Sequence, residues 1–233
     1  MIILADLAAL LPAVERFATA FTKLLPALDL VAAAVFAITG ALVASRKQMD
    51  IIGFIWFGTV TGVGGGTVRD LLLGVPVFWV QDATPVVACL IASIAVYFTA
   101  HLVNSRYRVI LWLDAVGLAL VTIAGTAKGI DHGAGAVVAV MMGMITASVG
   151  GIIRDILGQE PSILLRREIY VTASLLGAIC YVVLLGFDAG RWLAAFVGGL
   201  AVFVIRGQAI SYGLSLPSYR PRAGRSVEET ETK

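Results

Sequence analysis

The chain has 233 residues, of which 59% are hydrophobic and only 14% are charged, with a net charge of +2. Soluble domains are about 25% charged, so this composition excludes an ordinary water-exposed surface. The small net charge provides no strong field for nucleic acid, and the sequence contains no metal-binding cysteine spacing. It also shows no nucleophile paired with a base. We therefore predict an all-α membrane protein that is not an enzyme and needs no cofactor or metal.

Seven segments are long and apolar enough to cross a bilayer core of about 30 Å, which takes roughly 20 residues per helix. In chain order they cover residues 27–45, 51–73, 84–103, 109–127, 134–158, 168–186 and 189–208. Residues 1–26 carry four charged side chains and are predicted to lie at the membrane interface or to extend the first span. Residues 209–233 are polar and rich in turn-forming residues, and we expect a disordered tail.

The distribution of Lys and Arg predicts the orientation, because cytoplasmic loops carry an excess of both. Eleven of these residues fall on the side that holds the C-terminus, and four fall on the side that holds the N-terminus. The C-terminus is therefore predicted to be cytoplasmic and the N-terminus to be outside.

An internal repeat relates the two halves of the chain. Adding 85 to each position from Leu28 to Pro76 returns the same residue at 14 of 49 places without a gap. Three spans then belong to each copy, in residues 27–103 and 109–186, and the span 189–208 lies outside the repeat. Because three is odd, the second copy enters the membrane from the opposite side. The sequence thus predicts an inverted repeat, an architecture typical of transport proteins.

Glycines gather at matching positions of the second and fifth spans. These are Gly64, Gly65 and Gly66 in the first copy, and Gly150 and Gly151 in the second. Two interpretations remain open. Small residues four apart allow helices to pack closely in lipid. Alternatively, consecutive glycines break or kink a helix and free carbonyls that can bind a cation.

Polar residues accompany the glycines, and we consider them as pore-lining or gating groups. They are Thr61, Thr67, Arg69, Asp70, Asp114, Thr146, Ser148, Arg154 and Asp155. The charged pairs near the span ends either snorkel to the headgroups or face the protein interior as gating ion pairs. Because neighbours on a helix point about 100° apart, the Arg and Asp of each pair are not expected simply to neutralise each other. Asp29 and Asp114 are interpreted as helix caps or cation ligands, and Lys128 and His132 as parts of a solvated loop.

The doubled motif, GGGTVRDLLLGVPVFWV and GGIIRDILGQEPSIL, resembles bacterial members of the trimeric intracellular cation (TRIC) channel family. That group overlaps the UPF0126 proteins, whose domain is labelled a glycine transporter. The resemblance implies a homotrimer in the bacterial plasma membrane, with a pore inside each protomer between kinked second and fifth helices. It implies K⁺ or Na⁺ as the permeant ion and membrane lipids as neighbours. A transporter of glycine or a similar zwitterion, and a non-transporting scaffold, remain the alternatives.

Overall fold

The computed structural model describes residues 26–103, 105–160 and 169–217, and within these ranges the chain is helical and has no strand. The helices, in chain order, are a first helix (Pro26–Arg46), α2 (Ile51–Leu72), α3 (Phe78–Gln81), α4 (Thr84–Thr99), the 3₁₀ turn η1 (Ala100–Leu102), α5 (Arg106–Asp131), α6 (Ala136–Leu157), α7 (Val171–Gly186) and α8 (Arg191–Tyr212). The expectations for residues 1–25, for Pro161 and for most of the tail lie outside the described residues.

Six of these helices are long and apolar enough to cross a membrane, and α7 is a shorter apolar helix of 16 residues. Each lies within one of the predicted segments or extends it. Three expectations were wrong in detail. The short helix α3 was missed, α8 continues to Tyr212 into the predicted tail, and α5 runs to Asp131, so that Lys128 is helical.

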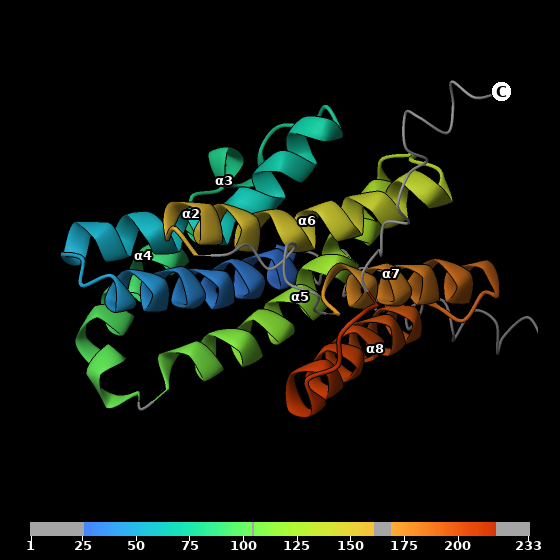
Figure 1. Cartoon of the computed structure of the whole chain (residues 1–233). Helices are drawn as coiled ribbons and strands as arrows, with labels where there is room; N and C mark the ends of the chain where they lie inside the picture. The colour runs from blue at the N-terminus through green and yellow to red at the C-terminus, as the bar shows by residue number, and fades with distance from the viewer. Residues whose placement is uncertain (1–25, 104, 161–168, 218–233) are drawn as a thin grey trace, which may run out of the picture.

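The helices form one bundle in which α5 is central. α5 packs against α6, α7 and α8, while α2 packs against α4 and α6. Figure 1 shows the first helix, in blue, between the α2 and α6 pair and α5, and it shows α7 and α8 side by side at the lower right. Ala41, Leu42 and Phe57 belong to one apolar cluster that joins the first helix to α2. The first helix is thus packed against α2, one of the two helices that carry the glycines.

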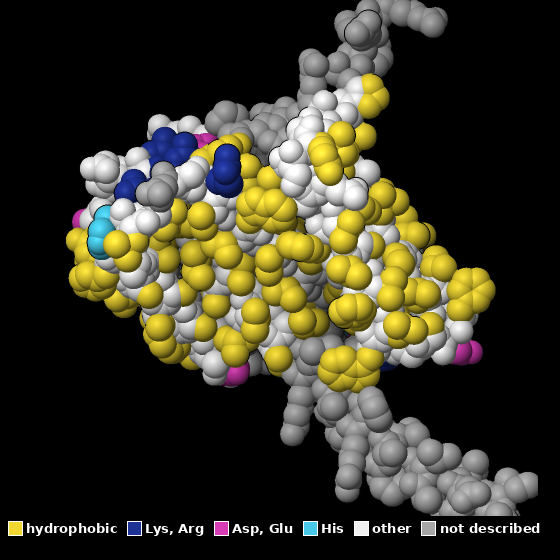
Figure 2. Space-filling model, turned by 90° about the horizontal axis from the view of Figure 1, so that it is seen from below, with side chains coloured by type: hydrophobic (Ala, Val, Ile, Leu, Met, Phe, Trp, Pro, Cys, Tyr) yellow, Lys and Arg dark blue, Asp and Glu magenta, His cyan; other side chains and the backbone are white. Residues whose placement is uncertain are grey.

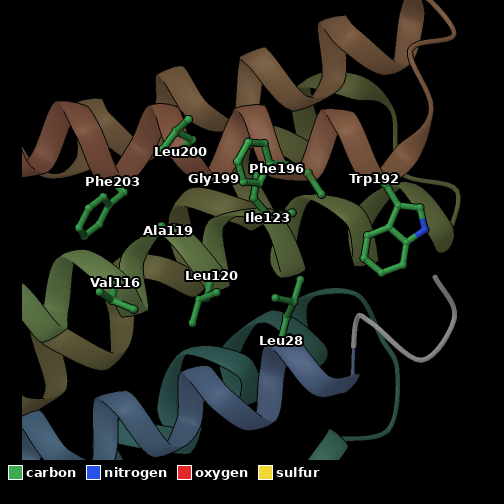
Figure 3. Close-up of a pocket in the computed structure, with 11 residues that line it drawn as sticks. Leu28, Val116, Ala119, Leu120, Ile123, Trp192, Phe196, Gly199, Leu200 and Phe203 are labelled. Atoms are coloured by element: carbon green, nitrogen blue, oxygen red, sulfur yellow. The ribbon is translucent and has the colours of Figure 1, made fainter. Parts of the chain in front are cut away.

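Many large hydrophobic side chains are exposed on the surface, as contact with lipid requires. Figure 2 shows hydrophobic side chains over most of one face and a group of Lys and Arg side chains at one end. A groove of about 390 Å³ lies between the first helix, α5 and α8 (Figure 3). Its described lining carries no charge, from Leu28 through Ile123 to Phe203. The groove therefore presents an apolar surface.

The ends of several helices are fixed by local hydrogen bonds. The Asp50 carboxylate accepts a hydrogen bond from the Gly53 backbone N–H at 2.7 Å and caps α2. The Asp82 carboxylate accepts hydrogen bonds from the backbone N–H and the hydroxyl of Thr84 at the start of α4. α8 ends at Tyr212 and is followed by Gly213, whose φ of 64° is left-handed. Local features of this kind therefore mark the starts of α2 and α4 and the end of α8.

Candidate functional site

The glycine runs lie inside uninterrupted helices. α2 is α-helical from Ile51 to Leu72 and α6 from Ala136 to Leu157, and Gly64, Gly65 and Gly66 do not have positive φ. The expected break was therefore wrong, because main-chain hydrogen bonds left open in an apolar environment would cost several kcal/mol each. Figure 1 shows the two ends of α2 running in different directions on either side of the place where α6 passes in front of it. A bend at the glycines remains a prediction, without freed carbonyls.

The two glycine segments contact each other where α2 and α6 cross. A methyl group added at Gly65 would overlap the carbonyl oxygen of Thr146, and one added at Gly150 would lie 2.8 Å from the carbonyl oxygen of Thr61. Gly65 and Gly150 are equivalent in the repeat, as are Thr61 and Thr146, so the same glycine–carbonyl contact occurs twice. Close packing of small residues is therefore one role of these glycines.

One cluster of charges lies at the end of α2. The Arg69 guanidinium donates to both carboxylate oxygens of Asp29, at 2.8 and 3.0 Å, and through Nε to Oδ1 of Asp70 at 2.8 Å. Asp70 also accepts a hydrogen bond from the Phe78 backbone N–H at 2.9 Å, and the Lys128 ammonium lies 2.8 Å from its Oδ1. The side chains of Arg69 and Asp70 are fully buried. This cluster joins the first helix, α2, α3 and α5.

A second cluster repeats the first at the end of α6. Arg154 donates through Nη1 to Asp114 at 2.8 Å, and through Nε and Nη2 to Oδ1 of Asp155 at 3.0 and 2.9 Å. It also donates to the Thr39 hydroxyl at 3.2 Å. Each of the three charged members is the repeat equivalent of a member of the first cluster. The repeated residues are therefore repeated in contact as well as in sequence.

These clusters correct several interpretations of single residues. Arg69 and Arg154 are buried and do not snorkel. Each binds the aspartate next to it, because the arginine side chain is long enough to fold back. Asp114 lies inside α5 and is no cap, and Lys128 belongs to the first cluster. A signal was present, since each arginine follows the earlier aspartate of its own copy at the same separation in sequence.

The predicted hydroxyls differ in their surroundings. Thr146 and Ser148 donate to carbonyls of their own helix, those of Met142 and Met144. Thr67 donates to the carbonyl of Val63 and accepts from the Trp79 indole at 2.8 Å. Thr61 is 1% exposed, and its hydroxyl has no hydrogen-bond partner in the described part of the chain.

A polar cavity of about 650 Å³ opens beside the first cluster. Its charged and titratable side chains come from the first helix, from the turn between α3 and α4 and from the end of α5, and they are Asp29, Asp82, Lys128, Asp131 and His132. Two hydrogen bonds from Thr84, one from its hydroxyl and one from its backbone N–H, hold the pKa of Asp82 below its ordinary value. Asp82 therefore keeps its negative charge at the cavity at neutral pH.

The equivalent place beside the second cluster is closed. The space there measures only about 10 Å³ and is lined by Arg154, Asp155 and Glu160 among others. Arg46 lies 3.0 Å from Oε1 of Glu160 across it. The repeat equivalent of Lys128 is Val43. The two ends therefore have equivalent positions in the repeat, but one carries a cationic side chain where the other carries an apolar one. The described residues thus leave almost no space beside the second cluster, whereas a large cavity opens beside the first.

A family model described as Glycine transporter matches the chain twice, at residues 26–101 and 111–186. The two matches are related by the same offset as the internal repeat. Among curated relatives, the UPF0126 inner membrane protein YadS of Escherichia coli is 42% identical over 198 residues, covering 82% of this chain and 94% of YadS. A UPF0126 membrane protein of Vibrio cholerae is 37% identical over 203 residues, covering 85% and 84%.

Solved structures decide the wider family. The TRIC orthologue from Rhodobacter sphaeroides is 52% identical, with a TM-score of 0.80, covering 82% of this chain and 98% of that one. The chain is a bacterial member of the TRIC family. A second prokaryotic TRIC channel is 28% identical, with a TM-score of 0.77 and coverage of 84% and 100%. This TRIC-family chain is accordingly a helical protein of the bacterial inner membrane.

Proposed function

We propose that this chain forms a homotrimeric channel for monovalent cations, chiefly K⁺, with one pathway inside each protomer beside α2 and α6. The observation that carries the proposal is the pair of repeated charge clusters that flank the crossing of these helices. Intramembrane charges are expensive and typically mark ion pathways. The structures of TRIC cation channels to which the chain is similar support the same function.

The architecture that we propose is an inverted repeat of three helices followed by a seventh. Several findings support it. The family model matches twice at the same offset, and the contacts of Gly65 and Gly150 are reciprocal. Repeats of opposite orientation place a site near the middle of the membrane, where the two copies meet. The crossing of α2 and α6 is that place.

The proposed pathway begins in the cavity lined by Asp29, Asp82 and Asp131. Carboxylates at the mouth of a narrow path raise the local cation concentration. It continues past Asp70 toward the Thr61 hydroxyl at the crossing. A buried hydroxyl without a partner costs about 1–3 kcal/mol, and a passing water or cation would relieve that cost. The Arg154 cluster lies at the far end.

In this arrangement the path is closed at two places. The ammonium of Lys128 forms an ion pair with the carboxylate of Asp70, which a permeating cation would otherwise approach. The Arg46–Glu160 ion pair covers the opposite end. We place the open cavity outside the cell and the closed end in the cytoplasm, following the excess of Lys and Arg at the latter. Opening then requires both ion pairs to separate.

The test is to compare K⁺ current and glycine uptake on one purified preparation. Planar bilayers should show unitary currents that reverse at the K⁺ equilibrium potential. Proteoliposomes should show no saturable uptake of labelled glycine beyond that of empty vesicles. Absence of current over a wide voltage range, together with saturable uptake, would reject the channel.

The alternative is a secondary transporter of a small zwitterion. Two observations favour it, namely the description of the family model and the position of Lys128 beside several carboxylates around one cavity. A zwitterion needs both charges for recognition. Competition of the labelled glycine by unlabelled glycine is the result that would establish this alternative.

A further inference from the structure

A second polar hollow lies outside the charge clusters, at the closed end of the molecule. It measures about 220 Å³ and is formed where several helices begin or end. Its lining consists of Ser45, Gln48, Met49, Phe54, Tyr97, Ala100, His101 and Arg106. Apolar side chains continue outward from it, since Phe98 and Leu102 are 62% and 70% exposed. The polar hollow therefore lies next to exposed apolar side chains of the kind that contact acyl chains.

The polar residues that line this hollow do not recur at the equivalent positions of the second copy. The repeat equivalents of Gln48, Tyr97 and His101 are Gly133, Val182 and Gly186. Hydrogen-bonding and aromatic groups in the first copy thus stand where the second copy has glycine and valine. The matching positions of the second copy carry no polar side chain, so the repeated helix packing does not by itself require those of the first copy.

The charges at the two equivalent places are also different. Nη1 of Arg191, the first residue of α8, lies 2.6 Å from Oδ1 of Asp131 at the end of α5. Arg191 lies just outside the repeated spans, but subtracting the same offset of 85 from these two positions gives Arg106 and Arg46, which are both cations. Asp131, the neutralising carboxylate, is therefore replaced by a second positive charge. Arg46 is matched by Glu160, and no carboxylate of the described chain lies within ion-pair distance of Arg106.

Arg106 is nevertheless held in place. Its Nε donates to the carbonyl oxygen of Ala100 at 3.2 Å, which fixes the guanidinium at the hollow. The two terminal nitrogens remain as donors, and a fork of this kind matches the oxygens of a phosphate. Lys47 and Arg108 lie close in sequence to Gln48 and Arg106, and both are exposed. They add positive charge at the same end.

We propose that this hollow binds the headgroup of an anionic phospholipid, with Arg106 on its phosphate and with Gln48 and His101 as further hydrogen-bond donors. Basic pockets between transmembrane helices are suited to such headgroups. The exposed Phe98 and Leu102 would lie along the acyl chains. The positive charge required for membrane orientation is the simpler explanation of these residues, but it needs neither a hollow nor a fixed guanidinium.

The experiment is native mass spectrometry of the purified full-length protein in detergent. It is titrated with phosphatidylglycerol, with phosphatidylethanolamine, and with soluble glycerol 3-phosphate. We expect phosphatidylglycerol to saturate one site per protomer and to bind more tightly than the other two. Arg106→Gln should raise its Kd about fivefold, the effect of one basic residue near an anionic surface, and Arg106→Lys should raise it less.

Two further variants separate a site from a general surface charge. Arg108→Gln removes a cation at the same helix end but outside the hollow, and it should change the Kd less than twofold. Gln48→Gly keeps the left-handed backbone, φ 58°, while removing a wall of the hollow, and it should weaken binding several-fold even where Arg106 variants fold poorly. Equal effects of Arg106→Gln and Arg108→Gln, or equal binding of the two lipids, would overturn the proposal. Tight binding of glycerol 3-phosphate would overturn the lipid as the source of the phosphate.

Discussion

The ammonium of Lys128 lies 2.8 Å from Oδ1 of Asp70, although the two residues belong to different halves of the repeat. The equivalent residue in the first half is Val43, so no ammonium stands at the matching position beside the other charge cluster. Lys128 is partly exposed to the open cavity, while Asp70 is fully buried. This contact is where the solvent of the cavity meets the buried network.

Replacing Lys128 by Met should increase cation current. The substitution removes the positive charge from the floor of the cavity, while Asp70 keeps its hydrogen bonds from Arg69 and Phe78. We expect the open probability in planar bilayers to rise several-fold. Arg108→Gln, which removes an exposed cation at the other end, serves as control. An unchanged or smaller current in Lys128→Met would show that this contact does not close the path.

Replacing Arg69 by Met should strongly destabilise the protein. The change leaves the carboxylates of Asp29 and Asp70 without their guanidinium, and breaking a buried pair from one side costs about 3–5 kcal/mol. Thermal unfolding followed by size-exclusion chromatography measures the loss. The double variant Arg69→Met with Asp29→Asn should recover part of it, because one uncompensated charge is removed. Equal stability of the single and double variants would contradict this pairing.

Replacing Gly65 by Ala should separate α2 from α6. Its new methyl group would overlap the Thr146 carbonyl, and overpacking of this kind typically costs about 1–3 kcal/mol. Gly150→Ala has a looser contact and should cost less. Gly186→Ala, at a position with no neighbour within 4 Å, is the matched control and should be close to neutral. We expect Gly65→Ala to reduce K⁺ current while trimers persist. Loss of trimers with unchanged current per trimer would assign the glycines to packing alone.

Replacing Asp82 by Asn should lower cation current mainly at low ionic strength. Asp82 is exposed at the cavity, so its field is screened by salt. Because the hydrogen bonds from Thr84 lower the pKa of Asp82, its charge persists as the pH falls and is lost only below the ordinary value for an aspartate. The Asp82 contribution to current should therefore be constant between neutral and mildly acidic pH. Single-channel recordings in dilute and concentrated KCl measure it, and an Asn variant with equal loss at both concentrations would contradict an electrostatic role.

The sequence was sufficient to predict the spans, because apolar length is a strong signal in a bilayer. It was also sufficient to identify the repeat. It did not predict the partner of Arg69, since Asp29 lies on another helix and span-by-span reasoning treats each charge alone. The same limit applies to Lys128, whose neighbours in sequence are typical of a helix end. The break predicted at the glycine run was wrong for a different reason. Helix propensity penalises glycine, but it does not include the cost of opening main-chain hydrogen bonds in an apolar interior.

The meeting of Gly65 with Thr146 and of Gly150 with Thr61 is a contact with main-chain carbonyls. A bulkier residue at Gly65 therefore cannot be accommodated by trimming the side chain of Thr146, because that side chain is not what it would strike. Second-site suppressors of Gly65→Ala should consequently arise away from the crossing, at residues that let a whole helix shift. At this crossing the two halves of the molecule are in contact through their backbones. A substitution of Thr146 or Thr61 therefore cannot compensate for a larger residue at Gly65 or Gly150.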